Sequence, residues 1–184
     1  MRRASSHLMF SPNCSTRKGL WDFRLVTNSI FSFQTLHLLR IMQDLEIAKN
    51  QLYNKNLTLA IVKNGIILFQ TDSHRISGFI GAIEKFGVQL NGASVADRVA
   101  GKALALLCVY AGIRQIYAEV LSRKAQAVFE DNKIMFEWKE IIDNVLDMNK
   151  ASVCPFEKVA ADISDPIESF AAFKALLEKM KLCR

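Results

Sequence analysis

The sequence predicts an α/β fold, a three-layer α/β/α sandwich with a mixed sheet. The chain has 184 residues, of which 51% are apolar, so one domain with a full core is expected. Residues 57–62 and 66–71 are rich in β-forming side chains and are joined through Asn64-Gly65, the pair that favours a two-residue hairpin turn. Apolar stripes at helical spacing then alternate with short β-rich runs, which is typical of this architecture.

The first half of the domain contains three predicted helices around the hairpin. Leu45, Ala48 and Leu52 recur at helical spacing, which predicts a helix over residues 44–53. A second helix is expected from a cap at Asp72 or Ser73 to Gly87, whose freedom to adopt a positive φ suits a helix end. A third is expected over residues 94–111, and its uniformly apolar second half indicates burial against a sheet.

The second half is predicted to alternate between strands and helices. Pro155 suits the first position of a helix, because its missing N–H is not needed there. Residues Phe170, Phe173, Leu176, Leu177 and Met180 are expected to face the core from the last helix. The expected order is a strand at 115–121, a helix at 124–131, a strand at 134–138, and helices at 155–163 and 165–181.

Charge separates residues 1–41 from the rest of the chain. This segment holds six of the basic residues and a single acid, Asp22, whereas residues 42–184 are nearly neutral. We therefore expect a disordered basic segment before a single domain that starts at Met42. The favoured interpretation is that Met42 is the true start, and the alternatives are an organelle transit peptide and a nucleic-acid-binding arm. Nucleic acid binding is not expected of the domain itself.

Location and redox state follow from two further observations. The longest apolar run, residues 103–111, is about half as long as a membrane span, so no membrane association is expected. The four cysteines have no short-range pairing pattern, which is typical of a reducing compartment and predicts a cytoplasmic protein.

Three strings resemble a known family. They are Gly-Ala-Ser-Val-Ala-Asp-Arg-Val-Ala-Gly-Lys-Ala at 92–103, Ala-Glu-Val-Leu-Ser at 118–122 and Cys-Pro-Phe-Glu at 154–157. They resemble an uncharacterised prokaryotic family, a domain of unknown function, over about residues 43–181. The resemblance implies a cytidine-deaminase-like fold with a mixed sheet and helices on both faces, in agreement with the element order above.

The usual zinc chemistry of that fold is not expected here. It needs a His or Cys two residues before a Glu at one helix start and Pro-Cys-x-x-Cys at the next. The corresponding positions here read Val95-Ala96-Asp97 and residues 122–127, with no thiol or imidazole. We therefore expect no metal ligand, no cofactor and no standard zinc-dependent deaminase; fold alone does not carry the activity across.

The leading candidate site is the segment from Ser94 to Lys102. On a helix, Arg98 and Lys102 share a face, and small residues around them allow close approach of a ligand. With the N–H groups of the helix start, this arrangement favours a phosphate or carboxylate, and Asp97 is the candidate acid–base group. The alternative is structural: Ser94 and Asp97 have capping-box spacing, and the bases can pair with acids elsewhere.

Two further groups of residues are candidates. Cys154 precedes a helix start, where a thiol can be reactive, and Glu157 can orient a partner; the alternative is that both form a helix cap. Glu119, Ser122 and Lys124 lie at a strand end, where open α/β sheets bind ligands. A serine in the position of Ser122 is more often a helix cap than a nucleophile.

The expected function is binding of a nucleotide or another small anionic metabolite, without the fold's usual zinc. Asp97 and Cys154 are the candidate catalytic residues; the candidate ligand contacts are Ser94, Arg98, Lys102, Glu119, Ser122, Lys124 and Glu157. One alternative is a non-catalytic scaffold that uses the same fold for partner binding or for self-association into a homo-oligomer. The other is an RNA-binding protein that uses the basic segment.

Overall fold

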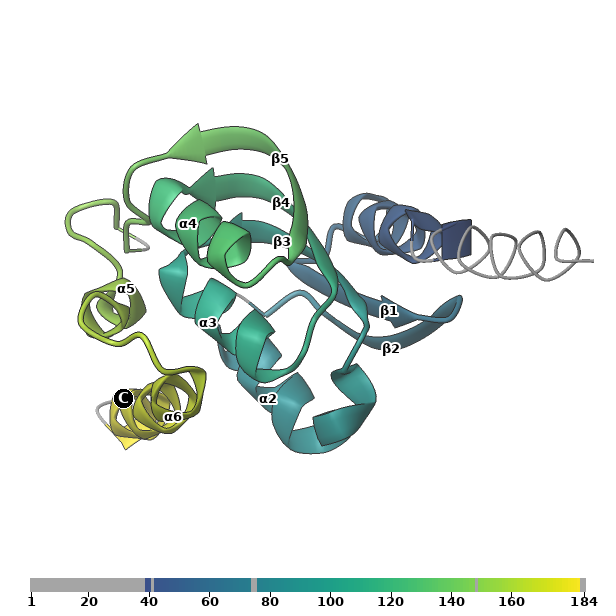
Figure 1. The fold of residues 1–184 in the computed structure, drawn as a ribbon. Helices are drawn as coiled ribbons and strands as arrows, with labels where there is room; N and C mark the ends of the chain where they lie inside the picture. The colour runs from purple at the N-terminus through teal and green to yellow at the C-terminus, as the bar shows by residue number, and fades with distance from the viewer. Residues whose placement is uncertain (1–38, 41, 74–75, 148, 183–184) are drawn as a thin grey trace, which may run out of the picture. The chain divides into compact units, whose positions relative to one another are not determined.

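The fold is an α/β sandwich built on one mixed five-stranded sheet, in the order β2-β1-β3-β4-β5 (Figure 1). The computed structural model describes residues 39–40, 42–73, 76–147 and 149–182. Most of the predicted basic segment 1–41 lies outside these residues. The strands are β1 Leu59–Lys63, β2 Ile66–Thr71, β3 Ser94–Ala100, β4 Gln115–Ser122 and β5 Met135–Ile142.

Helices cover both faces of the sheet, which confirms the predicted three-layer class. Residues 42–54 form the first helix. The others are α2 Ser77–Phe86, α3 Lys102–Tyr110, α4 Arg123–Asp131, α5 Pro155–Ala160 and α6 Pro166–Leu182, with a short 3₁₀ helix, η1, at Gly87–Leu90. None of the helices described has the length and apolar character that a bilayer crossing requires.

The alternating side chains of β1 show how the two faces differ. Leu59 and Ile61 enter the main core, which is shared with α2 to α6, whereas Ala60 and Val62 contact the first helix. We call the face toward α2–α6 the core face and the face toward the first helix the outer face. The outer-face cluster is much smaller and includes Leu45, Leu52, Ala96 and Tyr117.

Most of the predicted elements are confirmed. The β1–β2 hairpin turns through Asn64 and Gly65 with φ of 54° and 77°, as an Asn-Gly turn requires. Gly87 ends α2 with φ of 47°. The inward-facing side of the last helix is also as predicted, with Phe173 fully buried.

The prediction of one helix over residues 94–111 is wrong in its first half. Ser94–Ala100 is the central strand β3, antiparallel to β1 and parallel to β4, and the helix begins only at Lys102. Burial between two neighbouring strands outweighs the helical preference of the alanines. Two predictions that depended on this helix are therefore wrong as well: the capping box at Ser94 and Asp97, and the helix face shared by Arg98 and Lys102.

Three boundaries also differ from the prediction. Ile76 precedes α2 without a side-chain cap, so Asp72 and Ser73 do not cap it. β5 continues to Ile142, four residues beyond the predicted end at Trp138. α5 ends at Ala160 and not at Ile163.

Candidate functional site

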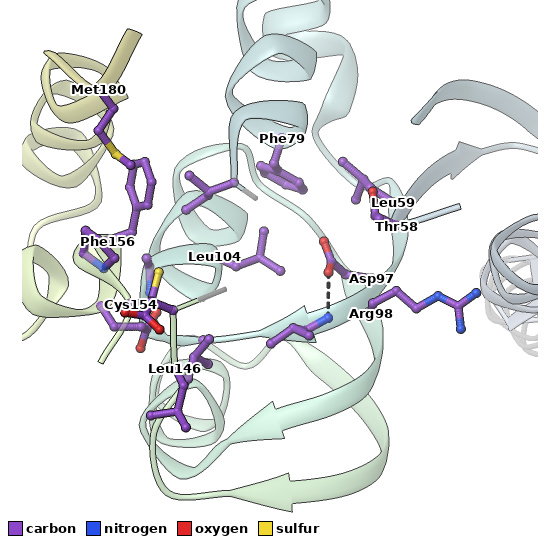
Figure 2. A pocket seen from close by; sticks show the side chains of 18 of the residues that line it. Thr58, Leu59, Phe79, Asp97, Arg98, Leu104, Leu146, Cys154, Phe156 and Met180 are labelled. Carbon is purple, nitrogen blue, oxygen red and sulfur yellow. Dashed lines mark hydrogen bonds between the residues drawn. The ribbon is translucent and has the colours of Figure 1, made fainter. Parts of the chain in front are cut away.

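A cavity of about 580 Å³ lies where the carboxyl end of β3 meets the starts of α3 and α5 (Figure 2). Its volume is within the range of small-molecule sites. Ligands of open α/β sheets commonly bind beyond the carboxyl ends of parallel strands, which is where this cavity opens. Its apolar walls come from many segments and include Leu59, Phe79, Leu104, Leu146, Phe156 and Met180.

Asp97 is the polar group that β3 directs into this cavity. Its carboxylate accepts a hydrogen bond of 2.8 Å from the Val99 N–H (Figure 2). Burial among apolar groups raises the pKa of Asp97 to about 7, and backbone hydrogen bonds from Val99 and Arg98 offset part of that effect. The side chain is only partly exposed. Asp97 therefore changes protonation near neutral pH inside an apolar cavity.

Glu157 closes the helix start beside the cavity. Its buried carboxylate accepts hydrogen bonds from the N–H groups of Lys102 at 3.0 Å and Ala103 at 2.9 Å, and so caps α3 from α5. A methyl group on Gly101 would lie 2.5 Å from the Glu157 carboxyl carbon, so the two segments are in close contact. The N-terminus of α3, where an anionic ligand was expected, is thus occupied by the protein's own carboxylate.

Arg98 lines the cavity with its backbone but directs its guanidinium to the outer face. Figure 2 shows the side chain pointing away from the cavity. There its Nη1 pairs with Glu119 at 2.7 Å and its Nε donates to the Leu57 carbonyl at 3.0 Å. The pairing lowers the pKa of Glu119. Arg98 and Glu119 therefore join β3, β4 and the first-helix region, and neither directs its charge into the cavity.

Lys102 is also engaged by the protein. Its Nζ donates a 2.9 Å hydrogen bond to the Ala161 carbonyl, at the end of α5. Because Arg98 is on a strand and Lys102 on the following helix, the two bases do not form the predicted anion clamp.

The remaining predicted residues lie apart from the cavity, except Cys154. Ser94 is at the opposite end of β3, where its hydroxyl accepts from Gln115 at 2.9 Å. Ser122 caps α4 through the Ala125 N–H at 3.1 Å, and Lys124 donates to Asn144 at 3.0 Å. Cys154 is a free, partly buried thiol that lines the cavity directly before Pro155.

Four of the predicted residues thus meet at one cavity: Asp97, Cys154, Glu157 and the backbone of Arg98. The aromatic and apolar walls were missed as site residues, because Phe79, Phe156 and Met180 look like ordinary core positions in the sequence. Asp147 and Asn149 were missed because they belong to a loop that no periodicity predicts. Asp147 accepts from the Ala151 N–H at 3.0 Å, and backbone donors such as this one lower its pKa.

The charge of the cavity lining is acidic. Asp97, Asp147 and Glu157 line it, and Arg98 is the one base among the described lining residues, with its charge directed elsewhere. Such a lining favours a neutral or donor-rich ligand over a phosphate.

The residues at the two helix starts do not fit a zinc ion of the deaminase type. Because α3 begins at Lys102, the residues at its start are Gly101–Ala103 and not Val95–Asp97. Their side chains include no thiol, imidazole or carboxylate that could bind zinc. The α4 start follows the cap Ser122 and likewise lacks thiols. Among all the residues described, no group of three or more His, Cys, Asp or Glu side chains is placed to hold a metal ion.

Comparison with known proteins gives one family. The sequence model of the family TM1506, described as "Domain of unknown function (DUF1893)", matches residues 47–177. The crystal structure of a DUF1893 family protein from Thermotoga maritima is similar, with 27% identity and a TM-score of 0.65, over 74% of this chain and 90% of that one. The expected family is therefore confirmed. A search of curated proteins gives no match.

Larger deaminase proteins are more distantly similar. A diaminohydroxyphosphoribosylaminopyrimidine deaminase/5-amino-6-(5-phosphoribosylamino)uracil reductase from Thermotoga maritima shares 18% identity at a TM-score of 0.36, over 68% of this chain and 41% of that one. RibD from Acinetobacter baumannii shares 18% identity at a TM-score of 0.35, over 70% of this chain and 38% of its own. The present chain thus spans less than half the length of either protein.

Proposed function

Because the chain belongs to the DUF1893 family, a domain of unknown function, we propose from its own residues that it binds a small molecule in the cavity beside Asp97. The proposed ligand has a flat or apolar body and a hydrogen-bond-donating group, such as the base of a nucleoside or nucleotide. The observation that carries this proposal is the Asp97 carboxyl in an otherwise largely apolar cavity.

Asp97 is suited to recognise an N–H or O–H donor. A carboxylate in an apolar environment forms stronger hydrogen bonds than one in water, and its remaining acceptor capacity points into the cavity. The aromatic rings of Phe79 and Phe156 in the walls provide flat apolar surface for a ring. These features favour a heterocycle that carries an amino or imino group.

An anionic part of the ligand is proposed to remain outside the cavity. Glu157 already occupies the helix N-terminus, and the charged side chains directed toward the cavity are acids. In a nucleotide, we therefore propose that the base enters and the phosphate stays at the mouth. This proposal changes the expected role of Arg98 and Lys102, whose charged groups are bound to the protein.

Thermal-shift and calorimetric titration of matched ligand series tests the proposal. Free bases, their nucleosides, the monophosphates, ribose 5-phosphate and inorganic phosphate should be compared at pH 6 and 8. Bases and nucleosides should raise the melting temperature, since a ligand of the folded state stabilises it. Adding the phosphate should not improve affinity.

Asp97→Asn should weaken binding of the responding ligand at least about tenfold, the usual effect of losing a charged hydrogen-bond acceptor. Asp131→Asn, at the exposed end of α4, is the matched control and should bind as the wild type does. Binding of phosphate or ribose 5-phosphate alone would contradict the proposal, as would affinity that is equal in wild type and Asp97→Asn.

A second candidate is proton transfer to or from the bound molecule by Asp97. Its pKa of about 7 is the value that suits a general acid–base group near neutral pH. Incubation of an identified ligand with wild type and Asp97→Asn, followed by mass spectrometry, distinguishes the two functions. A product that forms with wild type alone supports catalysis, and an unchanged ligand supports binding without reaction.

A further inference from the structure

β5 is an open edge of the sheet. It pairs with β4 on one side and is last in the strand order, so its other edge has no pairing strand among the residues described. Figure 1 shows it as the outermost strand of the sheet. The strand is eight residues long, and Met135 and Trp138 are 43% and 45% exposed. A long edge with exposed apolar side chains is a template for pairing with another chain.

The centre of this edge carries opposite charges on either side of a tryptophan. Glu137 and Lys139 are two residues apart and point to the outer face, where they contact Lys49 and Glu119 respectively. Both side chains remain largely exposed, at 55% and 67%. Read in the opposite direction, the order Glu-Trp-Lys becomes Lys-Trp-Glu, so the strand is complementary in charge to a second copy of itself.

We propose that two copies of this chain associate through antiparallel pairing of their β5 edges, with Trp138 opposite Trp138 of the partner subunit. In this register Glu137 lies opposite Lys139 of the partner subunit, and the two-fold axis repeats that pair. Met135 lies opposite Ile141 of the partner subunit. Both kinds of cross-strand pair, charged and apolar, are favourable.

Charge selects this register over its neighbours. In an antiparallel pair with the core faces of both copies on the same side, one residue lies at the two-fold axis opposite its own copy. The alternative registers differ in which residue that is. Centring on Glu137 opposes two glutamates, and centring on Lys139 opposes two lysines. Like charges directly opposite each other are destabilising, so the Trp138-centred register is favoured.

The other edge of the sheet lacks this selectivity. β2, Ile66–Thr71, has no charged residue, and its pairing with β1 is irregular at Ile61 and Val62. Its exposed Ile66 supplies apolar area without a preferred register. Since edge pairing covers less than a standard interface, we expect a dimer that dissociates in the range of about 1–100 μM.

Sedimentation velocity of the full chain across that concentration range tests the proposal. Wild type should show a concentration-dependent monomer–dimer equilibrium. Glu137→Lys alone places lysine opposite lysine, and Lys139→Glu alone places glutamate opposite glutamate, so each should raise the dimer dissociation constant at least tenfold. The double variant Glu137→Lys/Lys139→Glu restores both pairs and should dimerise again.

Mixing the two single variants gives the sharpest readout. One strand then carries two lysines and the other two glutamates, so the mixture should form a heterodimer more tightly than either variant forms a homodimer. Damage to the fold would not produce this recovery, and circular dichroism of each variant checks it separately. Lys179→Glu and Glu130→Lys, on exposed sites of α6 and α4, are the charge-matched controls and should dimerise as wild type does.

Several outcomes would overturn the proposal. Wild type that stays monomeric throughout, a dimer that ignores both single substitutions, or no complex in the mixture would each contradict β5 pairing. Dissociation by Ile66→Glu without any response to the β5 variants would assign association to the β2 edge instead.

Discussion

The core face and the outer face of the sheet are stabilised in different ways. On the core face, α2 to α6 bury a continuous apolar cluster that includes Ile116, Leu107 and Phe129. On the outer face, one helix covers part of the sheet, and polar contacts surround a small apolar cluster. Those contacts include the Tyr53–Tyr117 hydroxyl pair at 2.6 Å and the Arg98–Glu119 ion pair.

This difference places the proposed binding residue and a structural ion pair on opposite faces of one strand. Successive side chains of β3 point to opposite faces, so Asp97 enters the core-face cavity and Arg98 joins the outer-face network. A helix would have placed the two charges on nearby positions. The alternation of a strand explains why the expected acid–base group lies in the cavity while the expected anion contact does not.

The largest expected effect on stability is at the N-terminus of α3, which Glu157 caps on the core face. Gly101→Ala should destabilise the fold by about 3 kcal/mol, because the added methyl group displaces the buried Glu157 carboxylate from the N–H groups of Lys102 and Ala103. The backbone of Gly101 is extended at φ −97°, so strain does not explain such a loss. Urea unfolding measures it.

A double-mutant cycle identifies the cause of that loss. In a Glu157→Ala background, the Gly101→Ala substitution should cost less than about 1 kcal/mol, since the obstructing carboxylate is gone. Equal costs in the two backgrounds would show that the carboxylate is not responsible. Gly81→Ala, where an added methyl group meets nothing within 4 Å, is the control for a helical glycine.

The outer face should be most sensitive at Arg98. Arg98→Met keeps the apolar stem but removes the pair with Glu119 and the bond to the Leu57 carbonyl, so stability should fall by about 2 kcal/mol. Ligand affinity in the cavity should stay within about twofold of wild type. Arg123→Met, which removes an exposed pair with Asp143, should cost less than about 0.5 kcal/mol. An equal cost at both arginines would contradict a structural network on the outer face.

Asp97 should make the core face sensitive to pH. Its pKa of about 7 in the fold lies above the ordinary value of 3.8, so the folded chain holds a proton that the unfolded chain has released between these values. Stability is therefore lost as pH rises from about 4 to 7. Asp97→Asn removes the dependence and should be more stable than wild type at pH 8 by about 2 kcal/mol. The full difference between the two pKa values sets an upper limit of about 4 kcal/mol on this gain.

Denaturant titration at pH 5, 6, 7 and 8 measures this gain, which should shrink toward pH 5. A gain that is the same at every pH would show that burial of the Asp97 charge is not its cause. If Asp97→Asn stabilises the fold and also weakens ligand binding, the buried charge of Asp97 lowers stability but is needed for binding, a trade-off that is common at functional sites.

Much of the architecture could be predicted from local patterns. The Asn64-Gly65 hairpin, the Gly87 stop and the apolar stripe of α6 each depend on neighbours in the sequence, and all three are confirmed. β3 could not be predicted in this way, because its identity depends on burial between β1 and β4. Gly101 was an available signal, since glycine is unfavourable inside a helix.

The candidate site was predicted only in part for the same reason. Asp97, Cys154 and Glu157 line one cavity, yet they come from β3 and the start of α5, which only the tertiary fold brings together. The capping of α3 by Glu157 joins residues more than fifty positions apart, so no sequence spacing could indicate it.

The smallest expected effect is at Lys102, the second base of the predicted anion site. Lys102→Ala removes one hydrogen bond, from an exposed ammonium to the Ala161 carbonyl, and should change stability by about 0.5 kcal/mol. Its effect on ligand affinity should be within twofold, because its charge lies against the end of α5. Calorimetric titration beside Asp97→Asn checks this. A tenfold loss of affinity in Lys102→Ala would show that Lys102 contacts an anionic part of the ligand. Asp97 would then no longer be the only charged residue of the predicted Ser94–Lys102 site that acts on the ligand.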